Sequence, residues 1–180
     1  QTMLANPADL PTVEIPIRFH RTRVATETDG DTLFINEKVT TTNLADGSDL
    51  GLLDPRFAAT DVTLAVDRKT KEYLPDLMEE ADARTDQWGL PFHADKTATY
   101  KTWIAVAGQA LPAEYVEEDE TDGLATWRYV VDAKDVPLGP DPATGLPLMF
   151  ETVTDVWVEP NTGAAVDAVV RDTVNAVAPD

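Results

Sequence analysis

Few residues of this chain could act as nucleophiles, proton carriers or soft metal ligands. The sequence has no cysteine, two histidines (His20 and His93) and one serine, Ser48. A zinc site needs three or four nitrogen, oxygen or sulfur ligands, so it would have to combine both histidines with carboxylates. A Ser-His-Asp site would have to use Ser48, which lies in an ADGSDL stretch without the G-x-S-x-G motif. We therefore predict no catalytic residues, no metal site and no cofactor, and hence a protein that is not an enzyme.

Carboxylates are by far the most abundant reactive groups, with 33 Asp and Glu residues in the chain. The EEDETDG stretch at residues 117–123 has the charge of a calcium loop, but it lacks the ligand spacing and the distal Glu of an EF-hand. We interpret it as a solvated hairpin tip. Pairs of acids that could serve a glycosidase arise by chance in such a chain, so a carboxylate-based hydrolase is only the second alternative function.

One local excess of positive charge interrupts this acidic sequence. Arg18, Arg21 and Arg23 lie within six residues, together with His20. On a strand, Arg21 and Arg23 share one face, and Arg18 shares the other with His20. These arginines could meet an anionic headgroup or the acids of a partner. The alternative, which such clusters favour, is that they pair with carboxylates on neighbouring strands.

Aromatic residues crowd the second half of the chain and form the candidate ligand site. Large rings could line an apolar groove, since pockets for hydrophobic ligands are built from such side chains. The predicted ligand-binding residues are Tyr100, Trp103, Trp127, Tyr129, Phe150 and Trp157. The alternative is that the same rings form the main hydrophobic core. A cavity for a ligand would need small residues between the large ones, which nearby alanines could supply.

Composition and charge exclude several classes of partner. The chain has 180 residues, a net charge of −19 and only 14 Lys and Arg, so it lacks the cations that nucleic-acid binding requires. No apolar run approaches the 18 or more residues of a membrane span. The sequence contains 23 Thr and 18 Val, and branched side chains favour pleated sheets. The composition thus indicates an acidic, globular, β-rich protein.

The order of strand and turn signals predicts a mainly β fold. An Asp-Gly pair at residues 29–30 is typical of a hairpin, and 13 Pro and 9 Gly residues divide the rest of the chain into short segments. We expect an antiparallel curved sheet or a barrel-like sandwich of about eight or nine strands. The expected strands are 13–26, 32–42, 59–66, 98–104, 112–118, 124–134, 149–159 and 164–177. One short helix is expected at residues 75–84, and residues 1–12 are expected to form a flexible tail.

Two further features of the sequence leave alternatives open. The valines of residues 164–177 fit a helical stripe nearly as well as a strand, but the segment directly follows a tight turn, which favours a strand. Residues 60–71 and 154–163 also resemble each other: each has a Thr-Asp-Val strand, an acidic residue and a turn built around Thr. This echo indicates either two related halves with a cavity between them or a turn signal that recurs in many β proteins.

Several stretches resemble one known family in their order and spacing. LPFHADKTATYKTW (90–103), TDGLATWRY (121–129) and TDVWVEPNTGAAVD (154–167) are similar to the actinobacterial cell-envelope family called the porin PorA family. LPTVEIPIRF (10–19) and VDRKTK (66–71) resemble further parts of it. The resemblance implies a domain on the extracytoplasmic face of the cell membrane, between one membrane helix before it and one after it. It implies no catalytic residues.

Together, these observations predict a single extracytoplasmic β domain at residues 13–178 of a membrane-anchored envelope protein. We expect a non-catalytic function, the binding of a hydrophobic or lipid-like ligand through the six aromatic residues. The first alternative is a structural or interaction domain with a filled core, acting through its surface or edge strands. The expected partners are a lipid or an envelope protein, with no nucleic acid, and the membrane is reached through the flanking helices.

Overall fold

The computed structural model describes residues 16–52, 57–141 and 144–177, so the predicted tail at residues 1–12 lies outside the described residues. Contacts divide the chain into two compact units. Of the described residues, 16–85 belong to the N-terminal unit and 86–177 to the C-terminal unit. The single domain expected over residues 13–178 stays a prediction.

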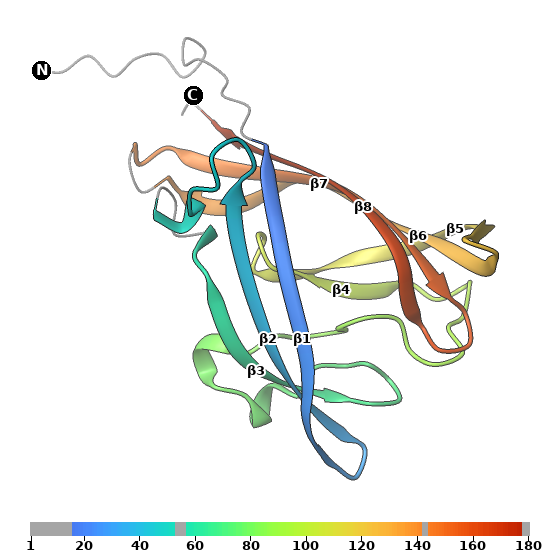
Figure 1. Cartoon of the computed structure of the whole chain (residues 1–180). Coiled ribbons are helices and arrows are strands. Elements are labelled where there is room, and N and C mark those ends of the chain that lie inside the picture. Colours follow the sequence, from blue (N-terminus) through green and yellow to red (C-terminus); the bar gives the residue numbers. More distant parts are fainter. Residues whose placement is uncertain (1–15, 53–56, 142–143, 178–180) are drawn as a thin grey trace, which may run out of the picture. The chain divides into compact units, whose positions relative to one another are not determined.

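The N-terminal unit contains a three-stranded antiparallel sheet (Figure 1). Its strands are β1 (Ile17–Asp29), β2 (Thr32–Asn43) and β3 (Thr60–Asp67), in that order across the sheet. A two-residue turn joins β1 to β2, and its Gly30 has a φ of +57°, which glycine adopts without the steric cost of a Cβ. A single-turn 3₁₀ helix, η2 (Leu50–Leu52), follows β2.

The C-terminal unit is a five-stranded antiparallel meander (Figure 1). The strands are β4 (Tyr100–Ile104), β5 (Gln109–Thr121), β6 (Leu124–Pro140), β7 (Pro147–Glu159) and β8 (Ala164–Ala176). Each pairs with the next strand along the chain, and β8 is therefore one edge of the sheet. Asp122 and Gly123 close the β5–β6 hairpin with positive φ angles, as this type of two-residue turn requires.

The predicted fold class is confirmed, with one difference. The described residues form eight antiparallel strands in two open sheets, and residues 164–176 are the strand β8 and not a helix. The short helix expected at residues 75–84 is instead two 3₁₀ turns, η4 (Pro75–Leu77) and η5 (Glu80–Asp82). Between them Met78 is extended, and neither turn has a capping side chain, so nothing propagates a helix through the segment.

The echo predicted between residues 60–71 and 154–163 includes two turns of one design. In the first, the Asp67 carboxylate accepts hydrogen bonds from the backbone N–H groups of residues 69 and 70, and its carbonyl accepts one from residue 71. Glu159 makes the same bonds with residues 161, 162 and 163. The fifth residue is left-handed in both, at φ +63° and +65°. Asp141, with residues 144 and 145, repeats most of this pattern, so the turn occurs beyond the two echoed segments.

These turns are electrostatically favourable because their N–H groups point at a carboxylate. The hydrogen bonds from the backbone of Asn161 and the side chain of Thr162 lower the pKa of Glu159 to about 2. Hydrogen bonds from the backbone of Thr70 and Lys69 likewise hold the pKa of Asp67 below its ordinary value. Both acids are therefore ionised at neutral pH, and each turn is closed by charge-assisted hydrogen bonds.

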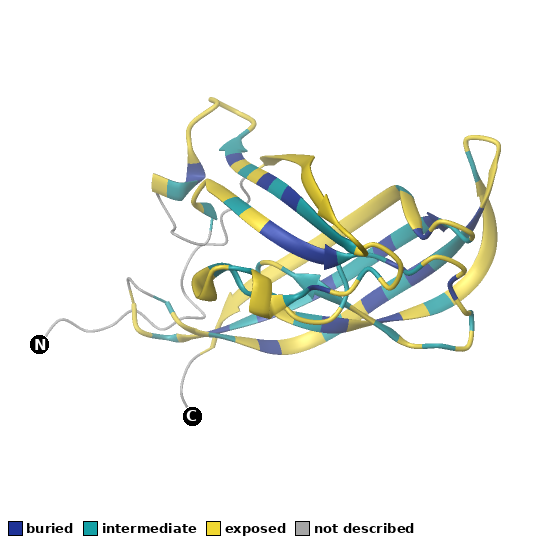
Figure 2. Ribbon diagram, turned by 90° about the horizontal axis from the view of Figure 1, so that it is seen from below, coloured by how far each residue is buried: buried dark blue, intermediate teal, exposed yellow. Residues whose placement is uncertain are grey.

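Burial alternates along the strands, as expected for sheets with one covered face (Figure 2). On β2, Ile35, Glu37 and Thr41 are buried and Lys38 and Thr40 are exposed. In the C-terminal unit two apolar clusters form along one face. The first consists of Leu111, Ala113, Val131, Val136 and Phe150, and the second of Leu90, Ala94, Tyr129 and Val158. The edge strands β1 and β8 are exposed along nearly their whole length.

We expect Gly163→Ala to destabilise the fold by about 3 kcal/mol, from left-handed strain together with overpacking. An added Cβ would lie 2.0 Å from the Leu90 carbonyl oxygen and 2.6 Å from that of Pro91, both backbone atoms. Gly145→Ala is the matched control, since Gly145 has a φ of +72° in a turn of the same design and no atom within 4 Å of such a Cβ. It should cost only about 1–2 kcal/mol. Urea unfolding measures both, and equal losses would contradict the packing explanation.

Candidate functional site

Four aromatic residues of the C-terminal unit pack against each other on one face of its sheet. Tyr115 and Tyr129 lie opposite each other on β5 and β6, with ring centroids 5.8 Å apart in an edge-to-face arrangement. Tyr129 also meets the ring of Tyr100 at 6.0 Å, and Tyr115 meets that of Trp127 at 6.0 Å. This geometry is the favourable one for aromatic pairs. The four rings therefore form one packed aromatic cluster, and each ring fills space next to its neighbours.

Residues 90–97 cover this group of rings. The backbone N–H of Asp95 donates a hydrogen bond of 2.7 Å to the Tyr100 hydroxyl, and the Tyr129 hydroxyl donates one of 3.4 Å to the Asp95 carbonyl. The Lys96 ammonium lies 4.6 Å from the centroid of the Trp127 ring and forms an ion pair with Glu118. Burial, together with the nearby Tyr100 and Asp95, raises the pKa of Tyr129 to about 12. Tyr129 is thus a neutral hydroxyl within a filled core.

The structure does not bring the six predicted ligand-binding residues together. Tyr100, Trp127 and Tyr129 belong to the cluster under residues 90–97, and Phe150 belongs to the other apolar cluster of the same face. Trp157 is seven residues from Phe150 on the same strand, so the two side chains point to opposite faces. The same alternation separates Trp103 from Tyr100 on β4. Trp127 and Trp157, expected in the core, are both half-buried.

The opposite face of the C-terminal sheet carries a network of charges. Asp155 is buried, and its carboxylate accepts hydrogen bonds from Arg128 at 2.6 Å and from Arg171 at 3.1 Å. Arg128 also pairs with Glu117 at 2.8 Å. The Trp157 indole N–H donates a hydrogen bond of 2.8 Å to Asp119 on the same face. Residues from four adjacent strands thus form a chain of alternating charge.

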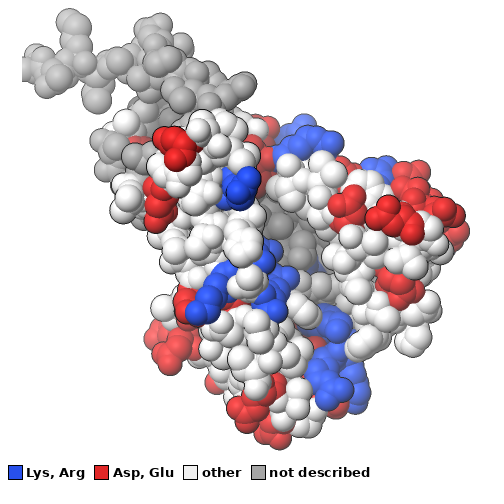
Figure 3. Space-filling view, viewed as in Figure 1, with Lys and Arg blue, Asp and Glu red and all other residues white. Residues whose placement is uncertain are grey.

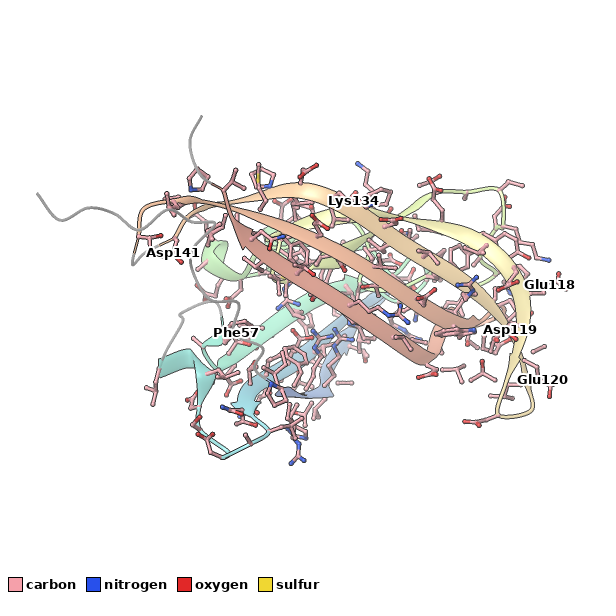
Figure 4. The ribbon with its side chains drawn as sticks, turned by 90° about the horizontal axis from the view of Figure 1, so that it is seen from above. Phe57, Glu118, Asp119, Glu120, Lys134 and Asp141 are labelled. Carbon is pink, nitrogen blue, oxygen red and sulfur yellow. The ribbon has the colours of Figure 1, made fainter. Side chains whose placement is uncertain are left out.

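The predicted hairpin tip at residues 117–123 has acids that point in different directions. Glu118, Asp119 and Glu120 lie near the end of β5 (Figure 4), where Glu118 pairs with Lys96 and Asp119 with Trp157. Successive strand residues face opposite sides, so these carboxylates do not converge. Among the residues that the structure describes, no group of three or more His, Asp or Glu could hold a metal ion.

The arginines of β1 converge on a carboxylate that sequence reasoning missed. Glu37 on β2 is 1% exposed, and Arg23 lies directly opposite it, with its Nε 2.6 Å from Oε2. The Arg21 Nε is 3.7 Å from the same oxygen, and Arg84 donates a hydrogen bond of 2.9 Å to Oε1. Arg84 also donates one of 3.5 Å to the Tyr73 hydroxyl. Arg21 and Arg23 thus pair with a carboxylate on the neighbouring strand, which is the alternative to binding an external anion. We call Arg21, Arg23, Arg84 and Glu37 the arginine cluster.

One signal in the sequence could have revealed Glu37. It stands between Ile35 and Val39 in the alternating pattern of β2, at a position that faces the core side of the sheet. A carboxylate at such a position needs partners, because a buried charge without them is very costly. Arg84 carries no comparable signal, since it is 47 residues away from Glu37.

The arginines keep Glu37 ionised despite its burial. Burial alone would raise the pKa of the Glu37 carboxyl, but the hydrogen bond from Arg23 and the charges of Arg23, Arg84 and Arg21 outweigh it and leave the pKa below its ordinary value. For Arg21 the balance is reversed: burial and the charge of Arg23 lower its pKa. The guanidinium groups therefore repel one another around a single carboxylate.

The remaining candidate residues have local roles. The Ser48 hydroxyl donates a hydrogen bond of 2.7 Å to Asp46 in its own turn. His20 is exposed on β1 opposite Thr40, and the backbone N–H of His93 donates to the Asn161 carbonyl at 3.0 Å. An open depression of about 450 Å³ lies in the N-terminal unit, which the sequence did not indicate. Its lining consists of Phe34, Thr63, Asp76, Leu77, Met78, Glu79 and Glu80.

The fold and these contacts define a class of protein: an antiparallel β protein with two sheets, each of which contains a buried carboxylate paired with arginines. Comparison with family models adds the identity. The model described as porin PorA matches residues 2–178, and the chain belongs to this porin PorA family. A search of curated proteins found no significant match. In the described part of the chain, no helix is long and apolar enough to cross a membrane.

We expect Glu37→Gln to destabilise the protein by about 2–4 kcal/mol at neutral pH. The cost falls somewhat below that of breaking a fully buried ion pair because Arg21 and Arg23 are partly hydrated. The pKa of Glu37 is lower in the folded state than in the unfolded state. The stability that its ionised carboxylate contributes is therefore fully present above the unfolded pKa, and it is lost as the pH falls through the folded pKa. The difference between wild type and variant should therefore shrink at about pH 3.

The matched control for Glu37 is Asp61, which pairs with Lys38 in the same sheet at 2.7 Å but is exposed. Asp61→Asn should change the stability much less than Glu37→Gln, as is usual for surface ion pairs. Urea unfolding of both variants at the two pH values tests the argument. A Glu37→Gln loss no larger than that of Asp61→Asn would show that the arginine cluster does not stabilise the sheet.

Proposed function

We propose that this chain is the extracytoplasmic domain of a membrane-anchored cell-envelope protein, and that it acts as a non-catalytic interaction domain. The observation that carries the proposal is the match to the porin PorA family over residues 2–178. A porin-family protein works at a membrane of the cell envelope, which is the setting the proposal requires. The actinobacterial origin and the flanking membrane helices are parts of this proposal.

The packing of the aromatic residues favours interaction over the enclosure of a ligand. Tyr129 and Phe150 are almost fully buried, and Tyr129 is covered by residues 90–97. The six rings also lie on two faces of the sheet, so they form no single lining. Binding of a lipid-like ligand by these residues stays a prediction of the sequence, and a filled core supports the interaction domain.

The strand β8 offers a surface for interaction. It pairs only with β7 among the described residues, which leaves the hydrogen-bonding groups of its other edge available over 13 residues. Val169, Val170 and Val174 are exposed along it. Proteins usually protect such edges with charged side chains, Pro or bulges. β8 contains no Pro or Lys, and its charged residues are Asp167, Arg171 and Asp172, of which Arg171 pairs with Asp155. We infer that an extended segment of another envelope protein adds a strand at this edge, as in β-augmentation.

The cellular location can be tested because the chain has no cysteine. Ser48→Cys and Glu120→Cys place one thiol on an exposed site of each unit, and Val66→Cys places one at a fully buried position as control. In the full-length protein expressed in its own cells, we expect a membrane-impermeant maleimide to label the first two thiols in intact cells. The buried thiol should react only after denaturation. Labelling of Ser48→Cys and Glu120→Cys only after lysis would overturn the proposed location.

The edge of β8 can be tested with a charge at an exposed position. Val170 is 57% exposed, so Val170→Lys should leave the melting temperature nearly unchanged. A lysine on the edge disfavours pairing with another strand, and we expect the native complex in mild-detergent extracts to fall to the size of the free protein. Val24→Lys on the edge strand β1 is the control, with 58% exposure. A complex of unchanged size in Val170→Lys, or its loss in both variants, would contradict the role of β8.

A further inference from the structure

The outer edge of β8 presents its backbone groups in a fixed phase. Ala176 lies opposite Leu148 on β7, and the Val177 N–H donates a hydrogen bond of 2.8 Å to the Pro147 carbonyl. In an antiparallel ladder this pattern means that odd-numbered residues of β8 bond to β7. The pairing with β7 continues without a shift over residues 167–176. The N–H and C=O groups of the even-numbered residues in this range therefore point away from β7, at an edge that no strand of the described residues covers.

The charged side chains of β8 are spaced for pairing with a copy of the same strand. Asp167 and Arg171 are four residues apart, so they lie on the same face of the sheet, with Val169 midway between them. The side chain of Arg171 is 65% exposed, although it pairs with Asp155. The exposed Asp167 carboxylate accepts a hydrogen bond of 2.8 Å from the Ala168 N–H, which is one of the groups of the outer edge. An antiparallel copy centred on Val169 would place each Asp167 opposite an Arg171.

We propose that a second copy of this chain adds the strand at this edge, with the two β8 strands antiparallel about a two-fold axis at Val169. The inference rests on the proposed role of the β8 edge and names the envelope protein that supplies the extended segment. A two-fold contact is self-complementary, so each interaction occurs twice. Asp167 of one copy pairs with Arg171 of the other. The Ala168 N–H, released from its own Asp167, bonds to the Val170 carbonyl of the second copy.

Backbone phase and charge together select this register. Because the even-numbered residues carry the outward groups, a regular ladder between two copies places even-numbered residues opposite even-numbered ones and odd opposite odd. Two pairs of opposite charge can be formed between copies of β8: Arg171 with Asp167 meets this condition, and Arg171 with Asp172 does not. In the selected register the charged residues form non-hydrogen-bonded pairs, in which side chains approach most closely. A shift by two residues in either direction would lose both ion pairs.

The second copy also extends a network that the chain already contains. Arg128, Asp155 and Arg171 alternate in charge across β6, β7 and β8. Asp167 of the second copy continues this alternation on the same face of the joined sheet. Val169, which is 37% exposed, meets its own counterpart on the axis and loses contact with water there. The interface thus combines backbone hydrogen bonds, two ion pairs and an apolar contact.

Two features of the chain make the expected dimer weak. The register of β8 shifts at the bulge opposite Trp157 and Val158, so the regular ladder between copies covers residues 167–171. The net charge of −19 on each chain also opposes association. The surface is not uniformly acidic, however, since Figure 3 shows Lys and Arg side chains gathered in groups among the acids. We therefore expect a dimer at high protein concentration and at physiological salt, where charges are screened over about 8 Å.

Single cysteines test the register, because the chain has no cysteine of its own. In the purified chain of residues 1–180, Val169→Cys would place its Cα about 4.5 Å from that of the second copy, within the range of a disulfide. Thr173→Cys is the matched control, since it is exposed on the same face but would lie about 25 Å from its counterpart. We expect mild oxidation to link Val169→Cys into dimers at least about tenfold faster than Thr173→Cys on non-reducing gels. Equal linking of both variants, or none of Val169→Cys, would overturn the proposal.

Charge reversal tests the ion pairs separately. Asp167→Arg and Arg171→Glu each turn both attractive pairs of the dimer into repulsive ones, so each variant alone should dimerise roughly tenfold more weakly by analytical ultracentrifugation. An equal mixture of the two variants should regain the dimer, because both pairs are attractive again in the mixed dimer. Asp132→Arg, at an exposed position of β6, is the control for the change in net charge and should leave dimerisation nearly unchanged.

Circular dichroism verifies that each variant is folded. Should Arg171→Glu fail to fold, because Arg171 also pairs with Asp155, then Asp167→Arg must still weaken the dimer relative to Asp132→Arg. Equal effects of these two variants, or no recovery in the mixture of folded variants, would contradict the pairing of Asp167 with Arg171.

A different partner at the same edge would give a distinct result. Val170→Lys would then still dissociate the native complex, whereas Val169→Cys in the purified chain would form no linked dimer, and the second copy would be excluded as the partner. A native complex that survives Val170→Lys would instead overturn the role of the β8 edge itself, and with it this dimer.

Discussion

The register of the hairpins determines which side chains of this protein can meet. A two-residue turn at Gly30 and Asp31 sets the pairing of β1 with β2, and a bulge between Ala25 and Glu27 shifts it by one residue. Together they place Arg23 directly opposite Glu37. Without the bulge, the alternation of β1 relative to β2 would be reversed beyond that point, and Arg21 and Arg23 would face the other side of the sheet. A local backbone feature thus creates the arginine cluster.

The same dependence on register governs the C-terminal unit. The turn that begins at Asp141 connects β6 to β7, and the acid-capped turn at Glu159 connects β7 to β8. The resulting registers bring Arg128 and Arg171 to Asp155. Each of the two buried carboxylates takes arginines from neighbouring strands. Asp155 has two such partners, whereas Glu37 has three, one of them from outside the sheet. This third partner, Arg84, ties a segment that follows β3 in the chain to the carboxylate of β2.

Much of the fold could be predicted from the sequence because its determinants are local. Gly, Pro and acid-Thr turns mark the ends of the strands, and the strand nature of residues 164–176 followed from the turn before them. The prediction of a helix at residues 75–84 was wrong, because the helix-forming residues there lack caps and a continuous apolar face. The arginine cluster was only half predictable: Arg21 and Arg23 were evident, while Arg84 meets Glu37 through a contact over 47 residues.

The candidate aromatic site illustrates a different limit. Alternation alone separates Trp157 from Phe150 and Trp103 from Tyr100, because the two members of each pair are an odd number of positions apart along a strand. Composition indicates that rings are abundant, but only register determines whether they share a surface. Residues 90–97, which have little strand or helix pattern, then cover the rings that do share one.

Filling of the apolar face has a consequence for function. A protein whose rings are used in its own core must recognise other molecules through charge, backbone edges or exposed apolar strips. All three are present on two of the edge strands: guanidinium groups and exposed apolar side chains on β1, and an edge without a partner strand among the described residues, with exposed valines, on β8. Glu37 is central to the first of these, because three guanidinium groups alone would repel each other apart. One buried carboxylate aligns the three guanidinium groups at the edge of the sheet.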